Sequence, residues 1–179
     1  MIPRPLEAPV RAVTFDLDFT LWDLTGVLHH AESVCQGFLE QRYPAVAARF
    51  DRDGLGTLRG QIAETRPDIA HDVTALRRAA FDEAGRLAGY TGAALDALVE
   101  EAFEVFLDAR HAVRVYDAAL PLLRALQGRV RIGALTNGNA EVRRLELGQY
   151  LDFALSPLAW CAAKPSPLLF ATAASRACV

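Results

Sequence analysis

The sequence has few cysteines and no long apolar run. Its 179 residues include three cysteines, Cys35, Cys161 and Cys178, which form no closely spaced pair. This spacing does not indicate a disulfide framework, so we expect free thiols in a reducing cytoplasm. No stretch of about 18 uncharged apolar residues is present, so we expect no membrane span. The opening residues, MIPRPLEAPVR, lack the apolar core of a signal peptide.

The sequence also has a small net charge and very few lysines. The formal net charge is −3, and acidic and basic residues are mixed along the chain. We therefore expect neither a nucleic-acid nor a membrane partner. Among the 19 basic residues only Lys164 is a lysine. Because a lysine presents a compact charge on a flexible stem that arginine does not reproduce, this residue needs an explanation.

The residues that are present predict an α/β core with a helical insert. Apolar residues make up 52% of the chain, which suits a globular core. The β-branched and aromatic residues 10–17 (VRAVTFDL) predict a buried strand. From about residue 26 to 110 the chain is rich in alanine, leucine, glutamate and arginine. Two apolar stripes there have helical spacing, namely Leu76, Ala80, Ala84 and Leu87, and Leu95, Leu98, Val99, Ala102 and Phe106.

Helix and strand patterns alternate in the last third of the sequence. They predict a helix over 116–128 capped by Asp117, a strand over 129–138, a helix over 139–150, a strand over 153–156 and a helix after Pro165. This order is typical of a parallel sheet, in which ligands bind outside the carboxyl ends of the strands. The polar residues at or just past those predicted ends are Asp16, Asp18, Thr136, Asn137 and Lys164.

These residue types suit phosphoryl transfer. Two nearby carboxylates such as Asp16 and Asp18 repel unless a cation such as Mg²⁺ lies between them, and one can then attack phosphorus while the other moves a proton. A hydroxyl and backbone N–H groups at Thr136 and Asn137 would bind phosphate oxygens, and Lys164 would offset negative charge. Each short pattern alone is more often a turn or a helix start. Their order and shared position favour the functional interpretation.

The motifs resemble those of the haloacid dehalogenase-like hydrolases. DLDFTLWD (16–23) is similar to the family's first motif, LTNG (135–138) to its second and AAKPSPLLF (162–170) to its third. The resemblance covers nearly the whole chain and is typical of the subfamily with a helical cap inserted after the first motif. It implies a Rossmann-like core over 1–24 and 111–179 with a sheet of about three strands, and a helical cap over 25–110.

The resemblance also implies roles for individual residues. Asp16 would be the nucleophile that forms an aspartyl-phosphate and would hold Mg²⁺, and Asp18 would be the general acid and base, with its backbone carbonyl also binding Mg²⁺. Thr136, Asn137 and Lys164 would bind the phosphoryl group. Dehalogenases of this superfamily typically lack the second aspartate, so a small phosphate ester is the implied substrate. Phe19 stands where the family usually has glycine or another small or acidic residue.

The family's fourth motif, a strand ending in acids that complete the Mg²⁺ site, is absent from the sequence. Asp152 is the last carboxylate residue. Because Mg²⁺ then lacks a charged ligand, we expect weak metal binding and impaired activity. The missing strands would pair with the strand over 10–17, so we expect that strand to be a sheet edge prone to self-association.

Three interpretations stay open on these residues. The first is a phosphatase of this family in a shortened chain, and the second is a non-catalytic protein that binds a phosphorylated ligand. The third, a two-component receiver domain, is disfavoured because its phosphorylated aspartate ends a middle strand and no large helical insert splits its core. The sequence does not fix the phosphorylated substrate. We expect Arg77 and Arg78 of the helical segment on a solvated helix surface.

Overall fold

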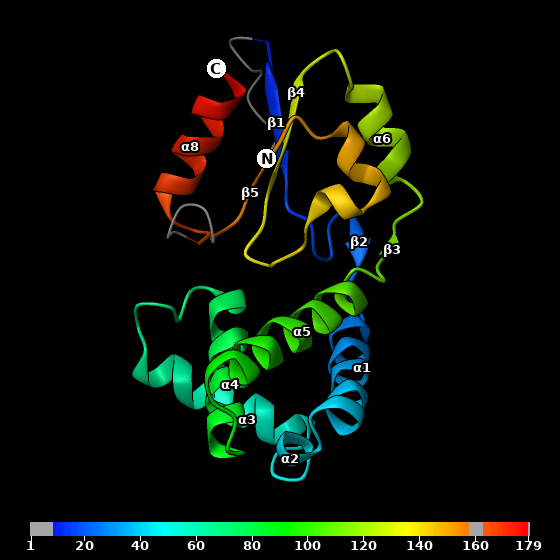
Figure 1. Ribbon diagram of the computed structural model, residues 1–179. Coiled ribbons are helices and arrows are strands. Elements are labelled where there is room, and N and C mark those ends of the chain that lie inside the picture. The colour runs from blue at the N-terminus through cyan, green and yellow to red at the C-terminus, as the bar shows by residue number, and fades with distance from the viewer. Residues whose placement is uncertain (1–8, 158–162, 179) are drawn as a thin grey trace. The chain divides into compact units, whose positions relative to one another are not determined.

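The computed structural model describes residues 9–157 and 163–178 (Figure 1). The chain folds into two compact units, which we call the core unit, Met1–Asp23 with Arg114–Val179, and the helical unit, Leu24–Val113. In the part of the chain that is described, no helix is both long and apolar enough to cross a bilayer.

The core unit is built on a parallel sheet. Its strands are β1 (Ala12–Phe15), β4 (Arg131–Leu135) and β5 (Phe153–Leu155), in the order β1–β4–β5. The strands predicted over 10–17, 129–138 and 153–156 are confirmed, although each is shorter than predicted. Because all three run in one direction, their carboxyl ends lie along the same edge of the sheet.

Strand β1 is at the edge of the sheet formed by the described residues. It pairs with β4 along one side, and none of its four residues is buried, whereas β4 is buried from Ile132 to Leu135. The prediction that residues 10–17 form a buried strand is therefore wrong, because β1 is paired and covered on one side only. The prediction that this strand is a sheet edge is confirmed for the described residues.

In the described part of the core unit, two α-helices accompany the sheet. Helix α6 (Ala119–Leu126) is shorter than the helix predicted over 116–128, and Gly128 follows it with a left-handed φ of 74°. The predicted cap by Asp117 is wrong, because Ala118 is the capping residue and no side chain caps the helix. Helix α8 (Pro167–Ala177) buries Leu169 and Ala173 against Leu135 and Leu155, the last residues of β4 and β5.

The helix predicted over 139–150 is wrong. Two short 3₁₀ segments occupy that stretch, η1 (Val142–Arg144) and η2 (Glu146–Tyr150). Leu145 between them has an extended backbone, with φ −114° and ψ 148°, which interrupts any continuous helix. The chain turns back closely enough that a side chain at Gly148 would overlap the Val142 carbonyl. The apolar residues that suggested a helix therefore lie in a tight double turn, which buries Leu147.

The helical unit contains only helices among its ordered elements. They are α1 (Val27–Arg42), α2 (Pro44–Ala47), α3 (Arg52–Thr65), α4 (Val73–Leu87) and α5 (Gly92–Arg110). Asp51 caps α3 by accepting from Gly54 N, and Asp72 caps α4 by accepting from Thr74 N and Ala75 N. The predicted stripe on α5 is largely confirmed, because Leu95, Leu98, Ala102 and Phe106 are buried.

Arg77 contradicts the expectation of a solvated surface. Its side chain is only 14% exposed and pairs with Glu32 at 3.2 Å, and its guanidinium carbon lies 3.5 Å from the centre of the Phe106 ring. Burial, followed by the positive charge of Arg59, lowers the pKa of Arg77 to about 10. The residue is therefore part of the interior of the helical unit, where an aromatic face and a carboxylate stabilise its charge.

A short antiparallel ribbon joins the two units along the chain. Strand β2 (Trp22–Asp23) pairs with β3 (Arg114–Val115), with Trp22 opposite Val115 and Asp23 opposite Arg114. The helical unit begins directly after β2 and ends directly before β3. The chain therefore enters and leaves the helical unit at two paired residues of this ribbon, Asp23 and Arg114.

We predict that Gly133→Ala destabilises the core unit. Gly133 lies opposite Phe153 in the β4–β5 pairing, and a Cβ atom there would overlap the phenyl ring. The expected loss is about 1–3 kcal/mol of the free energy of unfolding in urea. Gly37→Ala in α1 is the matched control, because its Cβ meets open space; it should raise stability by about 0.5–1 kcal/mol. Equal effects of the two variants would contradict the packing argument.

We also predict that the 179-residue chain self-associates through β1. An edge strand offers unpaired backbone groups, and a lysine on such an edge opposes pairing with another chain. The wild-type chain should give a mass above the monomer in light scattering, and Thr14→Lys, at the exposed position of β1, should shift the mass toward the monomer. Thr57→Lys on α3 should leave the mass unchanged. A wild-type chain that is monomeric at all concentrations would contradict this prediction.

Candidate active site

The sheet brings the ends of β1 and β4 next to each other. In the parallel register Phe15 lies opposite Ala134, so Asp16 leaves β1 beside the point where β4 continues to Thr136. Thr136 N in turn donates a hydrogen bond of 3.0 Å to Leu155 O at the end of β5. The polar residues predicted at the strand ends therefore share one edge of the sheet.

Asp16 and Lys164 form the central contact of this edge. Lys164 Nζ lies 2.6 Å from Asp16 Oδ1, and Leu17 N donates to the same oxygen at 2.8 Å. The side chains are 46% exposed for Asp16 and 22% for Lys164, so the pair is open to solvent on the aspartate side. This geometry holds the carboxylate in one orientation and leaves it accessible to a reactant.

Asn137 positions Lys164 through its backbone. The Asn137 side-chain oxygen accepts from Lys164 N at 2.7 Å, and Asn137 Nδ2 donates to Lys164 O at 3.0 Å. Two hydrogen bonds therefore fix the residue that carries the ammonium group, although the two residues lie 27 positions apart in sequence. The backbone N–H of Asn137 is still predicted to bind phosphate. Its side chain instead binds the backbone of Lys164, in the loop before α8.

Thr136 is buried directly after β4. It is 2% exposed, and its Oγ1 accepts a hydrogen bond from Gly138 N at 2.9 Å. This bond closes a tight turn over residues 136–138 directly after β4. Because Thr136 N and Gly138 N both donate within the protein, Asn137 N–H is the backbone group of the turn that we expect to bind an anion.

Trp22 is the residue that sequence reasoning did not connect to the site. Its ring is completely buried, as expected for a packing residue, and its Nε1 donates to Asp18 Oδ1 at 2.7 Å. The loop between them is closed by Phe19 N, which donates to Trp22 O, and by Leu21 N, which donates to Leu17 O. The sequence offers no signal for this bond except that Trp22 follows Asp18 by four residues.

Phe19, at the tip of this loop, has a left-handed backbone with a φ of 59°. For a residue with a Cβ atom that conformation costs about 1–2 kcal/mol. Glycine would adopt it without strain, which explains why a glycine suits this position. Its ring is 63% exposed, so the local packing does not explain why a phenylalanine is present.

Asp16 and Asp18 are the candidate metal ligands. In the ranges that the structure describes, no group of three or more histidine, cysteine, aspartate or glutamate side chains could hold a metal ion. The Asp16 carboxylate and the Asp18 backbone carbonyl are nevertheless the hard oxygen donors that Mg²⁺ prefers, and Mg²⁺ is commonly held by one or two carboxylates together with substrate phosphate. The residues present therefore fit a magnesium ion that binds together with a phosphorylated ligand.

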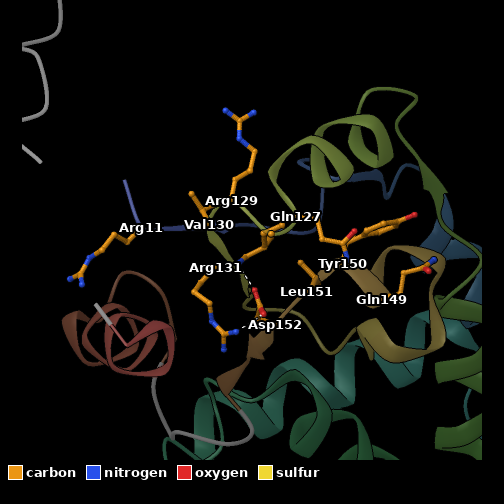
Figure 2. Close-up of a pocket in the computed structure, with 11 residues that line it drawn as sticks. Arg11, Gln127, Arg129, Val130, Arg131, Gln149, Tyr150, Leu151 and Asp152 are labelled. Carbon is orange, nitrogen blue, oxygen red and sulfur yellow. Dashed lines mark hydrogen bonds and ion pairs between the residues drawn. The ribbon is translucent and has the colours of Figure 1, made fainter. Parts of the chain in front are cut away.

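A hollow lies at the opposite end of the strands (Figure 2). It has a volume of about 360 Å³ and is bordered by Arg11, Arg129 and Arg131, near the amino ends of β1 and β4. Arg131 and Ile132 N both bind Asp152 there. The three arginine side chains point in different directions and do not converge on one ligand position. The carboxyl ends of the strands are therefore the better candidate site.

Comparisons with known proteins agree with this placement. Residues 10–177 match the family model of the haloacid dehalogenase-like hydrolases. The 5-amino-6-(5-phospho-D-ribitylamino)uracil phosphatase YigB of Escherichia coli strain K12 is 33% identical over 152 residues, which are 85% of this chain. The chain spans 63% of the length of that relative.

Solved structures show the same fold. A 2-haloacid dehalogenase from Pseudomonas syringae pv. tomato DC3000 is similar with a TM-score of 0.89 and 36% identity, covering 96% of this chain and 74% of that one. The HAD-hydrolase YfnB from Bacillus subtilis, in a magnesium-bound crystal form, has a TM-score of 0.54 and 16% identity, covering 94% and 73%. The second likeness is evidence for the fold alone.

We predict that Asn137→Ala weakens binding of inorganic phosphate. The substitution removes both hydrogen bonds to the Lys164 backbone, so the ammonium group is less well fixed beside Asp16. Because two such bonds each contribute roughly 0.5–1.5 kcal/mol, affinity measured by calorimetry with Mg²⁺ should fall by at least about 5-fold and at most about 150-fold. Gln127→Ala, which removes a side-chain amide from the hollow at the opposite strand ends, is the control. A phosphate affinity equal in both variants would argue against the positioning role.

Proposed function

Because this chain belongs to the haloacid dehalogenase-like hydrolase family, we propose that it is a phosphatase of that family acting on a small phosphorylated metabolite. The observation that carries the proposal is the contact of 2.6 Å between Lys164 Nζ and Asp16 Oδ1 at the strand ends. An ammonium group beside a nucleophilic carboxylate reduces the repulsion that a phosphate dianion would otherwise meet.

Asp18 supports a phosphate ester over a halide as the leaving group. An alkoxide needs a proton when it leaves, whereas a halide leaves without one, and Asp18 is the carboxyl group two residues from the nucleophile. Its hydrogen bond from Trp22 Nε1 gives it a defined orientation. The phosphatase name of the E. coli relative points the same way, whereas the P. syringae structure is that of a dehalogenase. Chloride release therefore has to be measured alongside phosphate chemistry to distinguish the two activities.

The proposed reaction has two steps. In the first, a carboxylate oxygen of Asp16 forms a bond to phosphorus, the ester P–O bond breaks, and Asp18 gives its proton to the departing alcohol. In the second, Asp18 takes a proton from water as the water oxygen attacks phosphorus. The bond from phosphorus to Asp16 then breaks, which releases inorganic phosphate and restores the carboxylate. The Thr136 hydroxyl and the backbone N–H of Asn137 bind the phosphoryl oxygens throughout.

Mg²⁺ is the proposed cofactor, with Asp16 and Asp18 as its ligands. When bound it supplies neutralisation of the phosphate charge as the carboxylate approaches. The residues of the helical unit, over 25–110, are proposed to be the substrate-selecting cap that the family resemblance implies.

Beryllium trifluoride, which mimics the phosphoryl group of an aspartyl-phosphate, tests this proposal in the 179-residue chain. With Mg²⁺ present, fluorine NMR should show a bound species that Asp16→Asn abolishes. Asp117→Asn, a carboxylate of the same unit that caps no helix, is the control and should retain the signal. In parallel, 2-chloropropionate should release no chloride. Chloride release that depends on Asp16, without binding of the fluoride complex, would show a dehalogenase instead.

We further predict slow turnover by this chain. One carboxylate and one backbone carbonyl, without a further acidic ligand, bind Mg²⁺ weakly, so p-nitrophenyl phosphate with Mg²⁺ should be hydrolysed near the background rate. Raising the Mg²⁺ concentration should increase the residual rate without saturation in the low millimolar range. Fast hydrolysis that is lost in Asp16→Asn would contradict this prediction. It would show that Asp16 and Asp18 are enough for catalysis with Mg²⁺.

A further inference from the structure

Phe19 is held in place by bonds that do not involve its own side chain. Its N–H donates to Trp22 O at 2.9 Å, and Thr20 N and Leu21 N both donate to Leu17 O, at 3.1 and 2.9 Å. The buried side chains of the loop are those of Leu17, Leu21 and Trp22. The backbone at residue 19 is therefore fixed by its neighbours, and the phenyl ring adds little to the packing that fixes it.

The ring combines two unfavourable features. The left-handed φ of 59° strains any residue that has a Cβ atom, and 63% of Phe19 is exposed to water. A glycine would remove the strain and a polar side chain would remove the exposed apolar area. Strain of this kind points to a task outside the local fold.

The position of Phe19 indicates which task. It follows Asp18 directly, and the hydrogen bond from Trp22 Nε1 to Asp18 Oδ1 fixes the loop on that side. On the other side, Leu17 N binds the carboxylate of Asp16. Phe19 therefore belongs to the same short loop that carries both proposed catalytic carboxylates, Asp16 and Asp18.

We propose that Phe19 binds the organic part of the substrate, and that the substrates are phosphate esters whose leaving group carries a planar aromatic or heteroaromatic ring. This inference rests on the proposed phosphatase function. An exposed phenyl ring on a fixed backbone offers a face and an edge for stacking, and ring-on-ring contacts contribute beyond the area they bury. Acyclic polyol phosphates would gain little from such a ring.

The test compares phenylphosphonate with methylphosphonate, two non-hydrolysable ligands that share a phosphonate group. Their affinities for the 179-residue chain with Mg²⁺ are measured by isothermal titration calorimetry. Phenylphosphonate should bind roughly 3- to 10-fold more tightly to the wild-type chain. Phe19→Gly should abolish that preference and leave methylphosphonate binding unchanged, whereas Phe19→Tyr should keep the preference. Phe170→Ala, which removes another exposed phenyl ring on α8, is the matched control and should keep it too.

The outcomes separate this inference from the function on which it rests. If both phosphonates bind the wild-type chain equally, or if the preference survives in Phe19→Gly, the inference is wrong and the phosphatase proposal stands. If neither phosphonate binds, the phosphatase proposal fails and the inference fails with it.

Discussion

Parallel hydrogen bonding between β1 and β4 determines where every polar residue of the site lies. The register that places Phe15 beside Ala134 also places the next residues, Asp16 and the turn at Thr136, at one edge of the sheet. A shift of one residue would turn the side chains of β1 to the other face.

The electrostatics of the site follow from this edge. Asp16 and Asp18 contribute two negative charges and Lys164 one positive charge, so the edge attracts a cation more readily than a free anion. A phosphorylated ligand that brings Mg²⁺ with it resolves the imbalance. Lys164 is supplied by a distant segment, and its position depends on the side chain of Asn137 rather than on the sheet. One part of the site is therefore positioned by strand pairing, and the part before α8 is positioned by the two hydrogen bonds of Asn137.

Sequence patterns predicted the site better than they predicted the local structure around it. The order of the motifs, joined to the rule that parallel strands end at one edge, was enough to place Asp16 and Lys164 together. The helix over 139–150 was predicted wrongly because its apolar spacing suits a tight turn as well as a helix, and only the closeness of Gly148 to the Val142 backbone separates the two. Arg77 was misplaced because its partners, Glu32 and Phe106, lie on other helices. The bond between Trp22 and Asp18 depends on a backbone turn that composition does not reveal.

The ribbon of β2 and β3 has a consequence for how this chain architecture can change. Because Asp23 lies opposite Arg114 in this antiparallel ribbon, the two ends of the intervening 24–113 segment are separated by about one strand spacing, roughly 5 Å. A tight hairpin turn could bridge so short a distance between β2 and β3. The strands of the core unit could therefore be connected without the 24–113 segment. Such a module can be lengthened, exchanged or replaced over evolutionary time with little change to the strands that flank it.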